Sequence, residues 1–421
     1  MQVEIINTGS ELMLGRVLNT HQQWLCRRLA DHGYPVSRQV AVPDTGPAIR
    51  DAVAEGLVRS DLVITTGGLG PTSDDITRDL VASMLGRPLH EDAEALANIQ
   101  RFFTARNRAM PQRVAIQAQV PAGTTVLQNE HGTAPGLALQ VAPGQFRDST
   151  SLLIMLPGPP RELRPMFDRQ ALPLICERLP VADAFHCVTL KTCGIGESMV
   201  EERLAPSLPP LLERGLEIGY CARTGEVDVR LTAIGDSGVD LIREGEALVR
   251  AALGDHIFGT GDDSLEAVVL QLARERNATL SVAESCTGGY LANRITNVPG
   301  ASAVLWGGWI VYDNAAKERQ LGVDPATLAE HGAVSEHCAR ELAEGALARS
   351  GTTHSLAVTG IAGPSGGTPE KPVGTVFIAL ASVAKPTLLR RQLNPFDRET
   401  FKYVTSQQAL EMLRCRLLTG K

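Results

Sequence analysis

The side chains best suited to chemistry lie in one short stretch, residues 279–291, TLSVAESCTGGYL. Its first half predicts a short buried strand, and the glycine pair before YLANRI predicts the start of a helix. Ser285, Cys286 and Thr287 therefore lie where a strand ends and helix N–H groups are unpaired, a place suited to an anion or a developing oxyanion. Ser285 is the best nucleophile of the stretch. The plainer alternative is that Ser285 or Thr287 caps the helix.

A second candidate site is the glycine-rich loop TTGGLGPTSDD, which follows the apolar run DLVITT. Its glycines let backbone N–H groups approach a phosphate, its hydroxyls can bind the same group, and its two aspartates can hold a hydrated divalent cation. The loop has neither the lysine of a Walker A motif nor the G-x-G-x-x-G spacing. An alternative of equal weight is that the aspartates only complement the dipole of the following helix. The residues concerned are Thr66, Gly67, Gly68, Gly70, Thr72, Ser73, Asp74 and Asp75.

Strands and helices must alternate to position these two loops. Apolar runs at residues 3–6, 61–66 and 151–156 predict strands, and helical spacing predicts helices, one of them over residues 20–32. Such alternation favours a parallel sheet covered on both faces. We therefore predict an α/β fold with two three-layer α/β/α domains, at residues 1–175 and 264–421, joined by a small α+β module at residues 181–260.

The small module shows no chemical motif, and its polar residues predict a solvated surface. Its PSLPP segment predicts a loop. In the last domain we expect helices over LEAVVLQLARERN, residues 336–350 with Ser335 as N-cap, and residues 400–418, with strands at LAVTG and VGTVFIALAS.

Composition limits the class of protein. The chain has 421 residues, 43% of them hydrophobic, which is enough for two or three cores. A net charge of −7 without any basic stripe argues against a nucleic-acid surface. Eight scattered cysteines without metal spacing indicate reduced thiols. With no signal peptide and no apolar run long enough to cross a bilayer, we expect a cytoplasmic protein that does not bind membranes.

Several long motifs, in a fixed order along the whole chain, resemble the bacterial competence/damage-inducible protein A (CinA) family. They are GSELMLG, TTGGLGPTSDDIT, HGTAPG, LPGPPREL, AESCTGG, VYDNAAKERQLGV, EHGAVSE, VTGIAGPSGG and KPVGTV. The resemblance implies an N-terminal domain similar to molybdopterin-binding folds and a C-terminal domain similar to nicotinamide mononucleotide (NMN) amidohydrolases. Family members are reported as ADP-ribose pyrophosphatases through the first domain and NMN deamidases through the last. They form dimers, so we expect a homodimer that acts on these small nucleotides.

The resemblance also implies roles for single residues. Ser285 would be the nucleophile, Lys317 its base, and Tyr312 would lie beside them. A lysine can take a serine proton only if its own pKa is lowered. The helix-start N–H groups would hold the oxyanion, and deamidation would need no cofactor. Substrate contacts would come from Cys286, Thr287, Gly288, Ser302, Thr359, Gly360, Gly363, Gly366, Gly367 and Arg398.

Cys286 is the alternative nucleophile, because a thiol beside a helix N-terminus can be activated. The sequence also departs from the usual family wording. YDNAAK replaces the commoner Tyr-Ser-Asn-Glu-Ala-Lys, and no second arginine run follows FDRET.

For the first domain we expect metal-assisted cleavage of a dinucleotide-like pyrophosphate. Asp74 and Asp75 would bind a divalent cation, Mg²⁺ or Co²⁺, with K⁺ as a further candidate ion, and Glu11 and Asn19 would face them. The competing class of function is a non-catalytic nucleotide- or pterin-binding regulatory protein linked to competence or the DNA-damage response. The presence of both Ser285 and Lys317 favours the enzyme.

Overall fold

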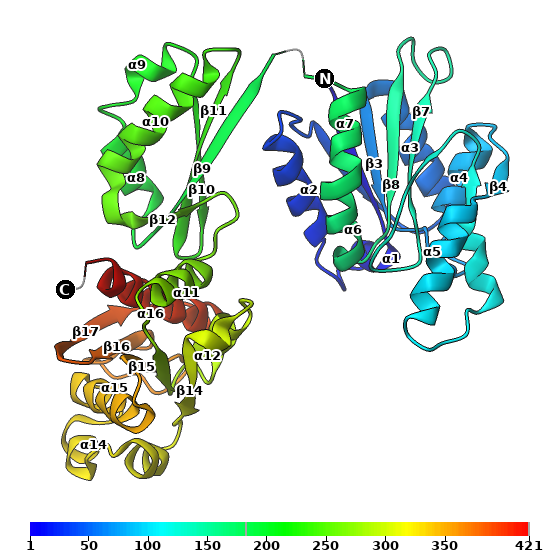
Figure 1. Ribbon diagram of the computed structural model, residues 1–421. Coiled ribbons are helices and arrows are strands. Elements are labelled where there is room, and N and C mark those ends of the chain that lie inside the picture. The colour runs from blue at the N-terminus through cyan, green and yellow to red at the C-terminus, as the bar shows by residue number, and fades with distance from the viewer. Residues whose placement is uncertain (182, 420–421) are drawn as a thin grey trace. The chain divides into compact units, whose positions relative to one another are not determined.

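The computed structural model describes residues 1–181 and 183–419. The chain forms two compact units, residues 1–186 and 187–421, and the small module and the last domain belong to the second unit. Both large domains are α/β layers, which confirms the predicted fold class (Figure 1). Within the described residues, every helix is too short or too polar to cross a membrane.

The first domain is built on a six-stranded sheet in the order β2-β1-β3-β8-β7-β6. The four strands β2, β1, β3 and β8 are parallel, whereas β7 and β6 are antiparallel to their neighbours. The strands are β1 (Val3–Thr8), β2 (Arg38–Val42), β3 (Leu62–Thr66), β6 (Thr125–Leu127), β7 (Gly136–Val141) and β8 (Ser151–Leu156).

Helices cover both faces of this sheet because side chains alternate along its buried strands. Val3 and Ile5 of β1 pack with α2, α6 and α7, whereas Ile6 packs with α3 and α4. The helices are α1 (Ser10–Met13), α2 (Thr20–Ala30), α3 (Gly46–Arg59), α4 (Thr77–Met84), α5 (Ala93–Thr104), α6 (Pro160–Met166) and α7 (Leu172–Arg178), with the π-helical turn η2 (Phe167–Ala171) between the last two. A 3₁₀ helix, η1 (Gln112–Ala118), packs beside α5. A small pair of strands, β4 (Leu89–Glu91) and β5 (Gln119–Pro121), adjoins η1 through β5.

The small module pairs a four-stranded sheet, in the order β10-β11-β9-β12, with three helices. Its elements are β9 (Phe185–Cys193), α8 (Glu197–Leu204), α9 (Pro209–Leu212), β10 (Glu217–Arg223), β11 (Glu226–Ile234), α10 (Gly238–Leu253), η3 (Gly254–His256) and β12 (Ile257–Thr260). The predicted α+β composition is confirmed. The PSLPP loop prediction was wrong at its end, because proline at the first position starts the short helix α9.

The last domain has a five-stranded sheet in the order β14-β13-β15-β16-β17, in which β13, β14 and β15 are parallel. The strands are β13 (Leu280–Glu284), β14 (Leu305–Ile310), β15 (His354–Gly360), β16 (Thr375–Ser382) and β17 (Lys385–Leu393). The sequence prediction missed β17, an edge strand whose many polar and exposed residues carry no strong apolar pattern.

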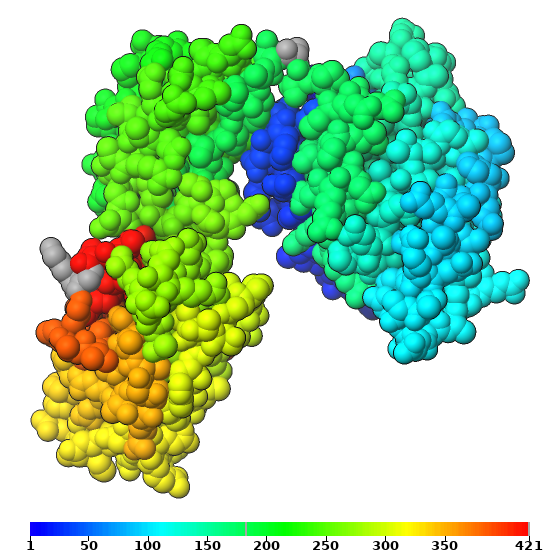
Figure 2. Space-filling model, viewed as in Figure 1, coloured from blue at the N-terminus to red at the C-terminus, as the bar shows by residue number. Residues whose placement is uncertain are grey.

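Two helical layers sandwich this sheet. Helices α11 (Leu265–Glu275), α12 (Tyr290–Thr296) and α16 (Arg398–Thr419) cover one face, and α15 (Glu336–Ser350) covers the other (Figure 1). Short helical segments complete the domain: η4 (Ala301–Ala303), α13 (Asn314–Ala316), η5 (Lys317–Leu321) and α14 (Pro325–His331). In Figure 2 the red atoms of α16 lie between the green module and the orange strands of the last domain. Ser335 caps α15 as predicted, through a bond from the Cys338 N–H.

Candidate active site

Ser285 lies directly after β13, at the edge of the sheet where the three parallel strands end. Its N–H donates to the Val358 carbonyl of β15 at 3.0 Å, and the Val311 N–H donates to the Glu284 carbonyl at 2.8 Å. The turn that carries Ser285 is therefore fixed between both neighbouring strands. The carboxyl ends of parallel strands are where open α/β sheets bind ligands.

Glu284 explains how the turn after Ser285 is shaped, and the sequence reasoning gave it no role. Its buried carboxylate accepts the N–H groups of Gly289 (3.0 Å), Leu291 (3.0 Å) and Ala292 (2.8 Å) at the start of α12. The expectation that helix-start N–H groups hold an oxyanion was wrong for these three, because a carboxylate already occupies them. A glutamate directly before a Ser-x-x-Gly-Gly turn could have suggested this capping role.

Lys317 lies at the same edge of the sheet, as the first residue of η5 in the helical segment that follows β14. Its side chain is almost fully buried, and its Nζ donates to the Tyr312 carbonyl at 3.0 Å. Burial lowers the pKa of Lys317, and the opposing influences of Cys338, Asp313 and Cys286 are smaller. Burial also raises the pKa of the Cys338 thiol to about 11, so that thiol is neutral near pH 7 and provides no counter-charge.

The turn that begins at Lys317 is π-helical over residues 317–321. Single π-helical turns are frequent at functional sites. They also occur where no function is expected, as η2 in the first domain does, so this feature supports the site without defining it.

Arg398 links two parts of the rim of this site. From the first turn of α16 it donates to the Tyr312 hydroxyl at 2.7 Å and to the Gly363 carbonyl at 3.0 Å. Tyr312 is 59% exposed, so its ring lies at the surface rather than beneath Ser285. The structure thus brings Tyr312, Gly363 and Arg398 together, although they come from three separate motifs.

The loop after β15 supplies the other predicted contacts. Thr359 is buried and donates to the Ala333 carbonyl at 2.7 Å. Gly360 must be glycine, because a β-carbon there would lie 2.8 Å from the Thr375 carbonyl oxygen. Gly363 and Gly366 have positive φ, and a β-carbon at Gly367 would lie 2.7 Å from the Val373 nitrogen. These glycines therefore hold the loop close to its own backbone.

The residues next to Ser285 differ in their surroundings. Cys286 packs in the hydrophobic core beneath α11, α12 and α16, and burial raises the pKa of its thiol to about 12. Thr287 is fully buried, and its hydroxyl has no hydrogen-bond partner within the described residues. Gly288 has φ +60° and open space where a side chain would lie.

Ser302 does not belong to this site, and that prediction was wrong. It lies in η4, before β14 begins, whereas Ser285 follows the end of the parallel strand β13. The two serines are therefore at opposite edges of the sheet. The reason is topological, since the connection from a helix into a parallel strand reaches the amino edge of the sheet.

The first domain contains a cavity of about 390 Å³ at the carboxyl edge of its own parallel strands. Of the predicted residues, Glu11, Gly67, Gly68, Gly70, Asp74 and Asp75 line it. Sequence reasoning missed Thr8, Gln117 and Glu162, which also line it and come from other motifs or none. Two glycines are required by packing, because a β-carbon at Gly68 would overlap the Thr77 hydroxyl and one at Gly70 the Asp75 carboxylate.

Four predicted residues of this domain are not among those lining the cavity: Asn19, Thr66, Thr72 and Ser73. Asn19 caps α2 by accepting the Gln22 N–H. The Thr66 hydroxyl donates to the Asn7 side chain at 3.0 Å. Thr72 donates its N–H, at 3.0 Å, and its hydroxyl to the Asp75 carboxylate. For these three, polar side chains satisfy local backbone or neighbour bonds, which is the commoner use of such residues near turns.

The carboxylates of the cavity do not form a ready metal site. Within residues 1–181 and 183–419, no group of three or more His, Cys, Asp or Glu side chains is arranged to hold a metal ion. Asp75 is partly used by Thr72, and Asp74 is exposed, with its pKa lowered by a hydrogen bond from Thr72. The arrangement fits only the mode in which one or two carboxylates share Mg²⁺ with the phosphates of a ligand.

Three family models match the chain. Residues 4–177 match the "Probable molybdopterin binding domain", residues 188–259 the "Damage-inducible protein CinA KH domain" and residues 262–417 the "CinA C-terminal domain".

Similar proteins cover nearly the whole chain. A CinA-like protein of Akkermansia muciniphila is 44% identical over 97% of this chain and 96% of its own length. A CinA-like protein of Gemmatimonas aurantiaca is 42% identical over 98% of this chain and 96% of its own length. Among solved structures, the competence/damage inducible protein CihA from Agrobacterium tumefaciens is 40% identical, covering 37% of this chain and 94% of its own, with a TM-score of 0.36.

Proposed function

This chain belongs to the CinA family, and from that premise we propose that its last domain hydrolyses the carboxamide of NMN to nicotinate mononucleotide and ammonia. The observation that carries the proposal is the buried Lys317 amine, whose lowered pKa suits a general base, at the same sheet edge as Ser285. A neutral lysine amine has a lone pair that can accept the serine proton.

The first half of the reaction acylates the serine. Lys317 takes the Ser285 proton, and the alkoxide attacks the carboxamide carbon to give a tetrahedral intermediate. The protonated lysine then gives its proton to the departing nitrogen as the C–N bond breaks and ammonia leaves. In the second half Lys317 takes a proton from water, the hydroxide attacks the ester, and the proton returns to Ser285.

The oxyanion donors must differ from the helix-start groups that Glu284 occupies. The backbone N–H groups of Cys286 and Thr287 are the candidates, since neither bonds a backbone carbonyl within the described part of the chain. An N–H of the residue after the nucleophile is a common oxyanion donor. These groups follow Ser285 directly, so the turn that presents the nucleophile would also present the donors.

The serine is favoured over Cys286 for two reasons. The Cys286 thiol is in the hydrophobic core, and burial raises its pKa to about 12, so very little thiolate exists near neutral pH. A neutral lysine amine can also activate a serine hydroxyl directly, by accepting its proton during the attack. Arg398 at the rim could then pair with the phosphate of the substrate.

A coupled ammonia assay tests the proposal. NMN should release ammonia, and nicotinamide and its riboside should do so more slowly because they lack the phosphate. Ser285→Ala should lower the rate about 10³-fold or more. Ser302→Ala is the matched control, because that serine is exposed and lies at the opposite sheet edge. If Cys286→Ala lost ammonia release while Ser285→Ala retained it, the nucleophile would be the Cys286 thiol instead.

The first domain has a second candidate function, supported by its own cavity. We propose that the cavity binds a phosphate-bearing nucleotide such as ADP-ribose. Five carboxylates line it, from Glu11, Asp44, Asp74, Asp75 and Glu162, and no Lys or Arg is among its lining residues. A phosphate would therefore enter together with a cation, and a divalent ion bound there would neutralise the phosphate charge.

Whether this domain also cleaves its ligand is decided by measuring AMP production from ADP-ribose with and without divalent ion. The same measurement on Asp75→Ala tests the metal role, and equal rates would remove it. Binding without cleavage would favour the non-catalytic regulatory class for this domain.

A further inference from the structure

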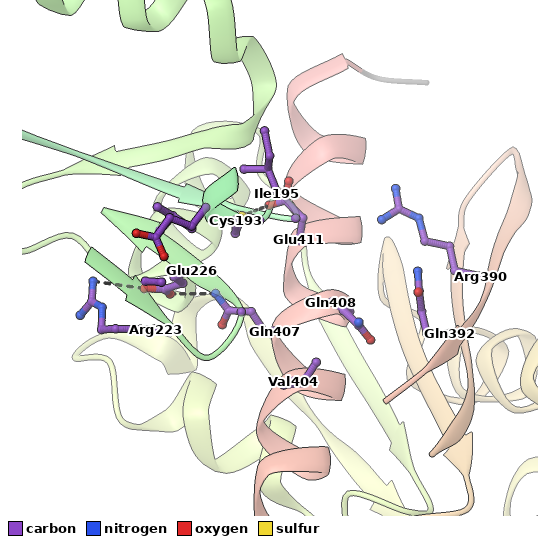
Figure 3. Close-up of a pocket in the computed structure, with 16 residues that line it drawn as sticks. Cys193, Ile195, Arg223, Glu226, Arg390, Gln392, Val404, Gln407, Gln408 and Glu411 are labelled. Atoms are coloured by element: carbon purple, nitrogen blue, oxygen red, sulfur yellow. Dashed lines mark hydrogen bonds and ion pairs between the residues drawn. The ribbon is translucent and has the colours of Figure 1, made fainter. Parts of the chain in front are cut away.

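The small module and the last domain enclose a cavity of about 500 Å³ that the proposed reactions do not use (Figure 3). Its floor is one face of α16, formed by Val404, Gln407, Gln408 and Glu411 at helical spacing. One wall is the loop and hairpin tip of the module, with Ile195 and Arg223. The other wall is β17, through Arg390 and Gln392.

The expectation that the module's polar residues form a solvated surface was wrong at this junction. Glu226, at the start of β11, is buried, and its carboxylate accepts a bond from Gln407 of α16 at 2.8 Å. Arg223 lies 3.5 Å from the same carboxylate and also bonds Asp228. The bond between Gln407 and Glu226 joins residues 181 positions apart, so no local pattern could have predicted it.

The charges of the cavity are largely paired. The Glu411 carboxylate accepts hydrogen bonds from Arg414 Nε at 2.7 Å, from Arg414 Nη2 at 2.8 Å and from the Cys193 thiol at 3.0 Å. Glu226 is satisfied by Gln407 and Arg223. Glu197 lies in the first turn of α8, where it complements the helix dipole. The acidic groups of the lining are therefore neutralised or placed favourably without a ligand.

Arg390 and Gln392 differ from these groups. They lie two residues apart on β17 and so share one side of the strand. Neither side chain forms a hydrogen bond or ion pair within residues 1–181 and 183–419. The uncommitted groups are thus a guanidinium and an amide, in a cavity that is also lined by apolar Ile195 and Val404. A cavity with a guanidinium and apolar lining suits an organic anion, and the planar fork of the guanidinium suits phosphate.

A buried polar chain connects this cavity to the candidate active site. Gln407 also accepts from Arg294 of α12 at 2.6 Å, and Arg294 donates to Ser406 at 2.8 Å. Arg294 belongs to α12, whose first N–H groups bond Glu284, the residue directly before Ser285. The opposite end of the floor helix, α16, begins with Arg398, which bonds Tyr312. The cavity floor is therefore joined through α16 to both sides of the site.

We propose that the cavity between the loop Gly194–Glu197, the face of α16 and β17 binds a small organic phosphate of mononucleotide size, with Arg390 holding the phosphate. The volume is in the range of small-molecule sites. The binding claim is independent of the deamidase activity. The further claim, that the bound phosphate changes the rate of deamidation, rests on the proposed function. It is argued from the hydrogen bonds that link Glu226, Gln407 and Arg294.

Hydrogen exchange on the full-length protein tests the binding, with AMP as the probe and adenosine and inorganic phosphate as comparison ligands. AMP should protect peptides covering residues 193–197, 390–392 and 404–411, and adenosine should not. Arg390→Gln should weaken the apparent Kd for this protection about 10- to 100-fold, which is the usual effect of losing one charge-assisted contact. Arg243→Gln is the matched control, because Arg243 lies exposed on α10 and, among the described residues, pairs with Asp240 alone.

Four outcomes would overturn the proposed site. Protection that is unchanged by Arg390→Gln, or that occurs only at residues 285–290 or 67–75, would place AMP elsewhere. Equal protection by inorganic phosphate would remove the requirement for an organic ligand. No protection at millimolar AMP would also reject the proposal.

Kinetics test the coupling separately. At saturating NMN, AMP should change kcat at least twofold in the wild type and not in Arg390→Gln. Simple competition with NMN, equal in both proteins, would show action at the active site and refute the coupling. If the wild type released no ammonia at all, the proposed deamidase function would be refuted. The hydrogen-exchange experiment would still show whether the cavity binds AMP.

Discussion

The most informative perturbation is Glu284→Gln, because it changes the anchor of the nucleophile turn without touching the nucleophile. The buried carboxylate accepts three N–H groups, two through Oε2, from Gly289 and Leu291, and one through Oε1, from Ala292 at 2.8 Å. A glutamine oxygen can replace Oε2. Its amide nitrogen would then face the Ala292 N–H, and two donors cannot bond each other.

The cost follows from these contacts. One buried donor loses its acceptor, which costs about 1–3 kcal/mol, and two bonds lose their charge assistance, about 1 kcal/mol each. We therefore expect Glu284→Gln to lower the local free energy of opening at the start of α12 by about 3–5 kcal/mol. Because each 1.4 kcal/mol is a factor of ten, amide protection at Gly289, Leu291 and Ala292 should fall about 100- to 4,000-fold.

Hydrogen exchange resolved at these amides is the assay, with ammonia release measured in parallel. The turn that holds Ser285 should loosen, so kcat should fall more than the KM for NMN changes. Glu336→Gln is the matched control, since Glu336 also lies in the first turn of a helix but is exposed, and Arg340 is its one ion-pair partner in the part of the chain that the structure describes. A loss below about 1 kcal/mol in Glu284→Gln, or an equal loss in the control, would refute the reasoning.

Further predictions concern the base, the rim and the first domain. Lys317→Met should lower ammonia release about 10³-fold, and the wild-type rate should rise with pH through a pKa below the ordinary lysine value, because burial lowers it. Between this lowered pKa and the ordinary lysine value, the unfolded chain binds a proton that the folded chain lacks, so the free energy of unfolding of the wild type should rise with pH in that range. A pH series of urea titrations should show a weaker pH dependence in Lys317→Met. Arg398→Gln should raise the KM for NMN about 10- to 100-fold and leave that for the riboside unchanged, as measured by steady-state kinetics. Gly68→Ala forces a β-carbon onto the Thr77 hydroxyl at a φ of +69°, so calorimetry should show loss of ADP-ribose binding while deamidation continues. Chelation of divalent ions should weaken ADP-ribose binding about tenfold or more, because the cavity has carboxylates and no basic side chain, and unchanged binding would contradict this.

Local pattern was sufficient for the order and type of most elements. Buried apolar runs gave β1, β3, β8 and β13, and turn residues placed the candidate nucleophile between a strand and a helix. It was less reliable where an element lacked such a pattern, as in β17. Local pattern also did not predict the burial of Lys317, since a lysine that follows two alanines is typical of an exposed helix face.

The sequence by itself determined the α/β architecture, the glycine loops and the types of side chain that could react, because these depend on periodicity and composition over a few residues. Only the tertiary structure decided which edge of a sheet each loop reaches and from which donor each buried side chain accepts a hydrogen bond. The sheet edge that each loop reaches is what separates Ser302 from Ser285. Tertiary contacts are also what give the Glu284 and Glu226 carboxylates their hydrogen-bond donors. Both depend on contacts between segments far apart in the chain, where burial leaves polar groups no alternative to pairing.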